Sequence, residues 1–181
     1  MRIQVCLAAV AATLIAASPA FAQQAPTASD TTSALAKGVV LQAHQLVKST
    51  DLDFGVVTVD SVNGGTVSIS ADSAGTRTTG GAGGVTGLPS TFQAASFDGL
   101  AAPGETVQLT LTPPSGGVIV STTNSNDKIT VTSLDLDSAG PTRVTDSTGQ
   151  FTVFVGGTFT LNAGQNAGVY QGQFQLQADY Q

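Results

Sequence analysis

The sequence predicts an all-β fold, either a sandwich or a barrel. Many short runs of apolar and β-branched residues follow one another, and turn-forming Gly, Pro, Asn and Asp residues separate them. Thr, Ser, Gly and Gln occupy the surface positions that Lys and Glu fill in helical proteins. The end of the chain alternates with period two, as a strand with one buried face does. Since little indicates a helix, strands are expected to supply the core.

The chain begins with the pattern of a secretory signal peptide. Arg2 is followed by an apolar stretch over residues 5–17 and by Ala20-Phe21-Ala22, a small-x-small cleavage pattern. The apolar stretch is too short and too rich in alanine for a convincing membrane span. We therefore expect residues 1–22 to be a signal peptide and the remaining chain to be exported, with no integral membrane segment.

The mature chain is acidic and free of cysteine. Cys6, the only cysteine, lies inside the predicted signal peptide, so no disulfide is expected. Residues 23–181 carry five Lys or Arg residues against twelve Asp or Glu residues, a formal charge of −7. Five scattered cations cannot form the basic stripe that nucleic acid or an anionic membrane surface requires. Nucleic-acid binding is therefore not expected.

The first part of the mature chain divides into an arm and a candidate strand. Residues 23–37 have little to bury, so we expect a flexible N-terminal arm before a single domain over residues 38–181. The apolar content rises over residues 34–47. A strand is the preferred interpretation of that segment, and a helical i, i+4 pattern stays open.

The rest of the chain reads as strands separated by turns. The predicted strands cover residues 54–62, 66–71, 91–97, 106–112, 117–122, 128–136, 151–155, 158–161 and 168–181. The turn signals include Asn63-Gly64-Gly65, Asp98-Gly99, Pro113-Pro114 and Ala139-Gly140-Pro141. The glycine-rich residues 75–87 are predicted to form a long surface loop.

Two details refine the strand assignment. Between Ile129 and Leu136 the apolar positions switch from odd to even numbers near Ser133, which indicates a β-bulge or a crossing between sheets. Gly156-Gly157 divides a long apolar stretch and is consistent with a kink or a turn there.

The last predicted strand carries the clearest alternation. Its even positions are apolar, aromatic or glycine, and from Gln171 on its odd positions are glutamine or aspartate. The even positions are Gly168, Tyr170, Gly172, Phe174, Leu176, Ala178 and Tyr180. Such a strand is either the last strand of a complete sandwich or a surface offered to another chain.

Few residues of the chain suit catalysis or metal binding. His44 is the only histidine, so a zinc cluster or a Ser–His–Asp triad finds too few partners, and no nucleophile elbow is present. Asp135 and Asp137, or the turn over residues 124–127, lack the calcium-loop pattern. We therefore expect no enzyme activity, no cofactor and no metal.

Three stretches carry a resemblance to a known family. They are Asp51-Leu52-Asp53-Phe54-Gly55, then Gly156-Gly157-Thr158-Phe159-Thr160-Leu161, and the stretch from Gly168 to Gln181. They resemble the bacterial domain of unknown function 4402, which is similar to spore-coat-U-type and chaperone–usher pilin domains. As in pilins, an aromatic residue (Tyr180) is penultimate and a glycine (Gly168) is fourteenth from the end. Many pilins have a disulfide, which this chain lacks.

The resemblance implies an incomplete immunoglobulin-like sandwich. In pilin domains a periplasmic chaperone lends the missing strand, and the N-terminal arm of a like subunit later replaces it beside the C-terminal strand. The implied interface with a partner strand is formed by Gly168, Tyr170, Phe174, Leu176, Ala178 and Tyr180. The implied donor strand would use Val39, Leu41 and Leu46. Residues 37–50 could equally be the first strand of their own domain.

The function implied is structural and adhesive. We expect a fimbrial, pilin-like subunit of a bacterial surface fibre, passing through the periplasm to the cell surface or the medium. Its partners would be a periplasmic chaperone and like or related subunits. The alternative is a self-complete extracellular β-sandwich that binds a ligand such as polysaccharide, although the absence of Trp counts against sugar stacking.

Overall fold

The computed structural model describes residue 35 and residues 37–181. Residues Val39–Gln181 form one compact unit of antiparallel strands. Among the described residues there is no α-helix, and no helix that could cross a membrane. The strands are β1 (Gln45–Thr50), β2 (Val57–Val59), β3 (Gly65–Ile69), β4 (Arg77–Gly80), β5 (Val85–Gly87), β6 (Ala95–Leu100), β7 (Thr106–Thr112), β8 (Val118–Ser121), β9 (Lys128–Leu136), β10 (Thr142–Val144), β11 (Gln150–Leu161), β12 (Tyr170–Gln171) and β13 (Gln175–Tyr180). A short 3₁₀ turn, η1 (Ser115–Gly117), precedes β8.

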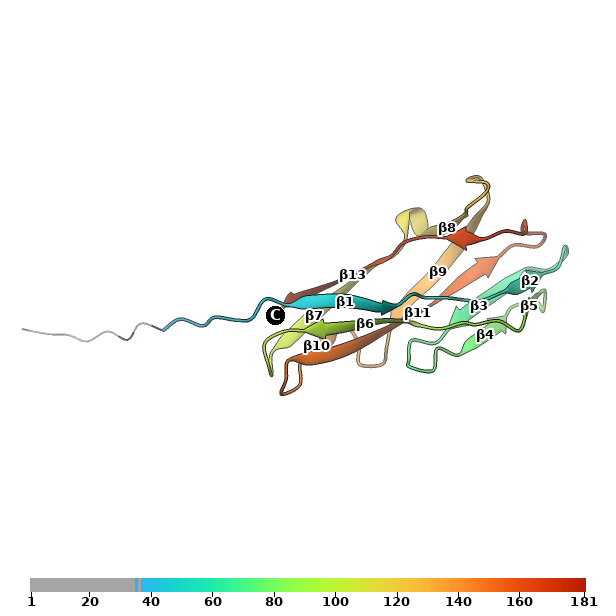
Figure 1. The fold of residues 1–181 in the computed structure, drawn as a ribbon. Helices are drawn as coiled ribbons and strands as arrows, with labels where there is room; N and C mark the ends of the chain where they lie inside the picture. Colours follow the sequence, from blue (N-terminus) through green and yellow to red (C-terminus); the bar gives the residue numbers. More distant parts are fainter. Residues whose placement is uncertain (1–34, 36) are drawn as a thin grey trace, which may run out of the picture. The chain divides into compact units, whose positions relative to one another are not determined.

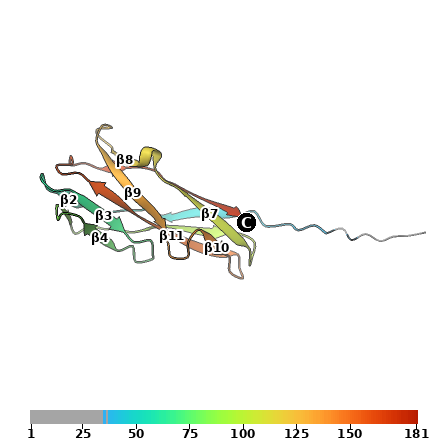
Figure 2. The same cartoon turned by 180° about the vertical axis from the view of Figure 1, so that it is seen from behind.

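The strands form two main sheets and a small ribbon. The larger sheet has the order β1-β6-β11-β9-β8-β12, with β3 and β4 attached beside β11, and the smaller has the order β10-β7-β13. Strands β2 and β5 pair with each other (Figure 1). Figure 2 shows the same unit from behind, with β7 and β10 beside each other. The predicted all-β sandwich is confirmed.

The main core lies between the two sheets. Its buried residues come from both: Ala95, Phe97, Phe151, Val153 and Val155 from the larger sheet, and Val107, Leu109 and Ala178 from the smaller. Burying each such Val, Leu or Phe side chain contributes about 1.5–3 kcal/mol. A second cluster contains Val67, Val85, Ile129, Phe159 and Leu161, near the β2–β5 ribbon.

Strand β11 passes through both clusters without a break. Its first half pairs with β6 and its second half with β3, and the partner changes at Gly156-Gly157. The expectation of a turn at this glycine pair is wrong. The strand continues, and a Cβ at Gly156 would lie 2.3 Å from the Ile69 carbonyl oxygen, so the glycine permits a close approach of β3.

The predicted bulge in β9 is confirmed. Thr158 of β11 lies opposite Ser133, whereas the next residue, Phe159, lies opposite Val131. Thr132 is therefore the extra residue. Because of this extra residue, Ile129 and Val131 before the bulge and Leu134 after it all lie on the inner face of the sheet.

Two other sequence predictions are wrong, because strands distant in the sequence pair with the segments concerned. Residues 75–87 are not one loop, because β4 pairs with β3 and β5 pairs with β2, and Val85 is buried. Asp98-Gly99 is not a turn but lies inside β6, where a Cβ at Gly99 would lie 2.1 Å from the Phe151 ring. Strand β10 follows directly after the predicted turn at Pro141.

Both ends of the predicted domain differ from expectation. The first strand begins at Gln45 and no helix forms over residues 37–44. The single strand predicted over residues 168–181 is divided: β12 pairs with β8 in the larger sheet and β13 pairs with β7 in the smaller. The predicted signal peptide (residues 1–22), and the arm (residues 23–37) apart from residues 35 and 37, lie outside the described residues.

Candidate functional site

A long groove opens between two segments that carry the family-like sequence stretches. Residues 51–57 form its first wall, and residues 168–174, the connection through β12 towards β13, form its second wall. The groove encloses about 840 Å³. Its remaining lining is almost entirely apolar and consists of Pro114, Ile119, Ile129, Val131, Leu134 and Phe159. The hollow therefore exposes the edge of the second core cluster.

The first wall is shaped by a turn at Asp53. The Asp53 carboxylate accepts a hydrogen bond from the Gly55 amide at 2.8 Å, and Gly55 has φ of +70°, which favours glycine. The Asp53 backbone exchanges two hydrogen bonds with Gln93, at 3.0 and 2.9 Å. This turn directs the Phe54 ring onto Phe159, with ring centroids 4.5 Å apart. The Leu-Asp-Phe-Gly stretch thus builds a groove wall.

The second wall is fixed by hydrogen bonds to neighbouring loops. The Thr122 amide donates to the Val169 carbonyl at 2.8 Å, and the Tyr170 hydroxyl donates to the Asn166 carbonyl at 2.6 Å. The Asn166 side-chain amide in turn donates to Asp127 at 2.9 Å. Val169 remains 60% exposed. Both walls are therefore held in place while the space between them is open.

Strand β13 has the alternation that the sequence predicts. Leu176, Ala178 and Tyr180 are buried or half-buried and belong to the main core, as does Phe174, whose ring meets Phe97 edge-on at 6.1 Å. The outward residues Gln175, Gln177 and Asp179 are exposed. Gly168 and Gly172 are also exposed, so the inward pattern holds at Tyr170 and from Phe174 on.

One edge of β13 is open. Leu109 of β7 donates its amide to Pro141 on the β10 side, so the pair Leu109–Ala178 is not hydrogen-bonded between β7 and β13. By alternation, the backbone groups of Leu176, Ala178 and Tyr180 point away from β7. Among the described residues, no backbone or side-chain hydrogen bond is made to these groups. The edge therefore presents free N–H and C=O groups.

Tyr180 joins the end of β13 to the segment before β1. Its hydroxyl accepts a hydrogen bond from the Ala102 amide at 2.8 Å and donates one to the Gln42 carbonyl. The His44 ring meets the Tyr180 ring edge-on, with centroids 5.7 Å apart. Figure 1 shows β1 starting at the end of the unit where β13 finishes. The contact with His44 has no signal in the sequence, because the two residues lie far apart in the chain.

The three residues predicted to form a donor strand are not together. Leu46 belongs to β1, faces Gly99 of β6 and packs against the main core of its own chain. Val39 is 73% exposed and Leu41 is 41% exposed, and neither lies in a strand. Residues 37–50 thus divide: β1 completes its own sheet, and residues 37–41 do not occupy the groove of their own chain.

The acidic residues serve local structure. Asp137, considered with Asp135 for calcium, is mostly buried and pairs with buried Arg143 at 2.6 Å. The pKa of Asp60, Asp72 and Asp146 is lowered from its ordinary value, chiefly because the carboxylates accept hydrogen bonds from nearby turn residues. In the part of the chain that the structure describes, no group of three or more His, Cys, Asp or Glu residues could hold a metal ion.

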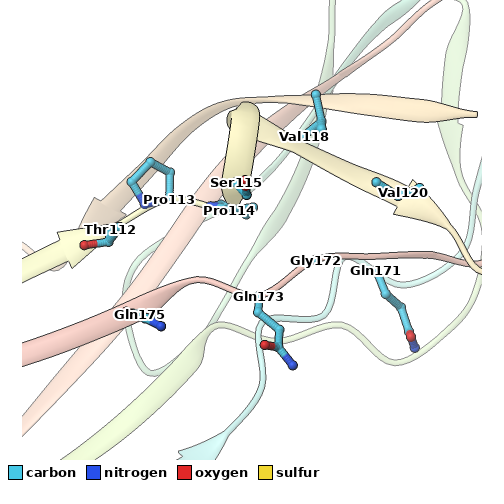
Figure 3. A pocket seen from close by; sticks show the side chains of 10 residues that line it. All are labelled: Thr112, Pro113, Pro114, Ser115, Val118, Val120, Gln171, Gly172, Gln173 and Gln175. Atoms are coloured by element: carbon cyan, nitrogen blue, oxygen red, sulfur yellow. The ribbon is translucent and has the colours of Figure 1, made fainter. Parts of the chain in front are cut away.

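A second, smaller hollow lies on the other side of the second wall. It encloses about 530 Å³, and its lining contains hydroxyl, amide and apolar groups but no charged residue (Figure 3). The lining residues are Thr112, Pro113, Pro114, Ser115, Val118, Val120, Gln171, Gly172, Gln173 and Gln175. Sequence reasoning missed this hollow, because Pro113-Pro114 reads only as a turn.

The family comparison matches the part of the chain that builds these features. The model of the family described as Domain of unknown function (DUF4402) matches residues 45–180, from the start of β1 to the end of β13. The chain belongs to this family. No curated protein and no solved structure matches the chain. The DUF4402 region thus contains both groove walls and strand β13, which begins directly after the second wall.

Proposed function

We propose that this DUF4402 chain is an exported structural and adhesive subunit of a bacterial surface fibre, assembled by addition of β-strands between subunits. The observation that carries the proposal is the free edge of β13, which begins next to Phe174, where a groove with an apolar floor ends. Only another strand supplies backbone partners and apolar side chains at once. The predicted export of the chain, with removal of residues 1–22, is part of the same proposal.

The strand order supports an immunoglobulin-like sandwich that lacks one strand. Immunoglobulin sandwiches pair strands A-B-E-D in one sheet and C-F-G in the other. Here β1, β6, β11 and β9 lie in the order of A, B, E and D, and β7 and β13 lie in the order of C and F. No strand of residues 35 and 37–181 takes the place of G, along the open edge of β13.

The edge of β13 also lacks three features that prevent strand addition. Natural sheets protect an exposed edge with lysine, proline or a bulge. Strand β13 contains none of them, and its pairing with β7 is regular. Strand β1, an outer strand of the larger sheet, carries Lys48 and an irregularity in its pairing between Lys48 and Thr50. We therefore expect an incoming strand to pair with β13.

The segment before β1 has the properties of a donor to a neighbouring subunit. Leu35 and Val40 are 93% and 97% exposed, and Val39 and Leu41 are exposed as well. Leu35, Lys37, Val39 and Leu41 share one face of an extended strand, so three of the four side chains on that face are apolar. Burying these three side chains in the groove of another copy would contribute about 4–9 kcal/mol of gross stabilisation. A periplasmic chaperone would fill the same groove before assembly.

A proline at Ala178 tests strand addition directly. The Ala178 amide points to the open edge, so Ala178→Pro removes a donor that β7 does not use and places the proline ring at that edge. Val144→Pro is the control on the opposite outer edge of the same sheet. Because Ala178 is buried and Val144 is exposed, urea denaturation of both variants first checks that each one is folded. We expect both variants to fold, and only Ala178→Pro to lose surface fibres and association between purified copies. Fibres of normal length from Ala178→Pro would contradict the proposal.

A self-complete binding module is the second candidate. The uncharged lining of the smaller hollow (Figure 3) suits a neutral ligand such as polysaccharide, which hydroxyl and amide groups can bind through hydrogen bonds. This candidate predicts a monomer whose association does not depend on the edge of β13. Binding of polysaccharide by a strictly monomeric protein, lost in Gln173→Ala and kept in Ala178→Pro, would favour it.

A further inference from the structure

A single guanidinium group bonds two backbone carbonyls of the first wall of the groove. Arg77, the first residue of β4, donates through Nη1 to the carbonyl oxygens of Phe54 and Val56, both at 3.1 Å. Through Nη2 it donates to the Leu88 carbonyl at 2.6 Å. We propose that Arg77 is the positioning residue of the groove: it fixes the wall that an incoming strand must contact. The inference rests on the proposed strand addition.

The surroundings of Arg77 are built for this arrangement. Its Nη1 also donates to the Ser90 hydroxyl at 3.2 Å, and its Cζ lies 4.6 Å from the centre of the Phe92 ring. Among the described residues no carboxylate pairs with Arg77. Backbone carbonyls are therefore its principal partners, and these carbonyls belong to the wall and to the segment behind it.

Two glycines leave the space that the guanidinium occupies. A Cβ at Gly55 would lie 2.6 Å from Arg77 Nη1, and a Cβ at Gly87 would lie 2.7 Å from Arg77 Nη2. Both distances are too short for a side chain. The glycine of the Leu-Asp-Phe-Gly stretch thus has two roles, since it also adopts a positive φ. The sequence stretch and Arg77 form one unit.

The Ser90 hydroxyl completes the connection. It accepts a hydrogen bond from the Val56 amide at 2.9 Å, while the Leu88 amide donates to the Val56 carbonyl at 2.9 Å. Residues 54–56 are therefore tied to residues 88–90 by Arg77 and Ser90, in addition to the Leu88–Val56 backbone hydrogen bond that extends the β2–β5 pairing. A planar guanidinium bonds several carbonyls at once, whereas a lysine ammonium on a flexible stem cannot reproduce this geometry.

Arg77→Lys tests the inference, with Arg143→Lys as the matched control. Both arginines have guanidinium groups bonded to backbone carbonyls. Arg143, however, lies in β10 of the smaller sheet and forms an ion pair with Asp137. The first readout is hydrogen exchange of the mature chain, residues 23–181. We expect the Val56 and Leu88 amides to exchange about tenfold faster in Arg77→Lys, and not in Arg143→Lys, because local opening governs exchange. The Thr122 amide, bonded to the second wall, serves as the internal reference.

The second readout is capture of a fluorescent peptide with the sequence of residues 31–44. We expect about tenfold weaker capture by Arg77→Lys and unchanged capture by Arg143→Lys. Ser90→Ala keeps the Arg77 guanidinium and removes the Ser90 hydroxyl that bonds it. We expect this variant to speed exchange and weaken capture as Arg77→Lys does, but to a smaller extent. The inference would be overturned if the Val56 and Leu88 amides of Arg77→Lys exchanged at the wild-type rate. It would also be overturned if these amides exchanged faster while the variant captured the peptide as well as the wild-type chain does. If the wild-type chain captured no peptide, strand addition would fail while the exchange result still decided the role of Arg77.

Discussion

Phe174 and Gln175 are neighbours with opposite surroundings. Phe174 packs against the main core and meets Phe97 edge-on, whereas Gln175 points outward from β13. We expect Phe174→Ala to lower the free energy of unfolding by about 3 kcal/mol, at the low end for a Phe truncation because the ring is only half-buried. Gln175→Ala should change it by less than about 0.5 kcal/mol. Urea denaturation of both variants measures the difference, and equal effects would contradict the assigned faces.

Asp98 is expected to contribute to the pH dependence of stability. The hydroxyls of Ser49 and Thr152 donate hydrogen bonds to its carboxylate and hold the pKa of Asp98 below its ordinary value of 3.8. The Ser49 hydroxyl lowers this pKa more than the Thr152 hydroxyl does. A lowered pKa means that this stabilisation is complete above about pH 4 and is lost as the pH falls through the pKa of the folded state.

Asp98→Asn is the variant that checks this pH dependence. We expect its stability to fall less steeply between pH 4 and pH 2 than that of the wild-type chain, since one carboxylate fewer takes up a proton. Thermal unfolding across that range measures the slope. Parallel curves for the two proteins would show that the two hydroxyl contacts do not perturb Asp98 in solution.

At the level of single residues, the sequence predicted which face of a strand a side chain lies on better than it predicted which distant residue that side chain contacts. The period-two pattern placed Leu176, Ala178 and Tyr180 on the inner face because side chains of a strand must alternate. The same reasoning could not find the contact of Tyr180 with His44. It also misread Gly99 as a turn residue, because the Phe151 ring that requires a glycine there belongs to another strand.

The connection between β9 and β10 depends on a buried ion pair. Asp137 accepts from Arg143 at 2.6 Å and from the Phe154 amide of β11 at 2.9 Å, while Arg143 also donates to the Gly140 and Thr142 carbonyls. Removing one partner leaves the other charge buried and unpaired. We expect Asp137→Leu to cost about 3–5 kcal/mol, and the double variant with Arg143→Met to recover part of that loss. A double-mutant cycle by chemical denaturation measures the coupling, and additive losses would contradict it.

At the level of elements, long alternating segments were predictable and short paired ones were not. Strands β7 and β9 have the predicted bounds, and the bulge in β9 is visible in the sequence as a change of parity. Strands β4, β5 and β10 have three or four residues each and exist because a neighbouring strand offers an edge. The division of the last strand follows from its change of sheet, which no local pattern records.

At the level of the whole molecule, Tyr180 separates the two candidate functions. In a self-complete module, Tyr180→Ala removes contacts at one end of β13, and the protein should still be exported at a normal level. In a subunit that accepts a strand, the variant loses an apolar residue beside the open edge, so periplasmic chaperone capture and fibre assembly should fall sharply. Immunoblots of periplasmic and surface fractions measure both quantities. Normal fibres from a stable Tyr180→Ala protein would count against strand addition.

The sequence alone supports the family and the all-β sandwich, but not the groove. The Leu-Asp-Phe-Gly stretch and the final alternation were visible as signals, and they do form its two sides. Its floor combines residues of β8, β9 and β11, and its first wall depends on Arg77 of β4. These residues come together only through the pairing order of the strands, which one sequence does not reveal.

The unbroken length of β11 has a mechanical consequence. If the chain assembles into a fibre as we propose, tension would stretch each subunit between the strand that it receives and the segment that it donates. Strand β11 runs through both core clusters and pairs with β6, β3 and β9, so no weak joint separates the two halves of the unit. A load along the strands would strain many hydrogen bonds at once in shear, instead of opening them one at a time. We therefore expect a pulled fibre to yield first at the joints between subunits, with each sandwich surviving intact.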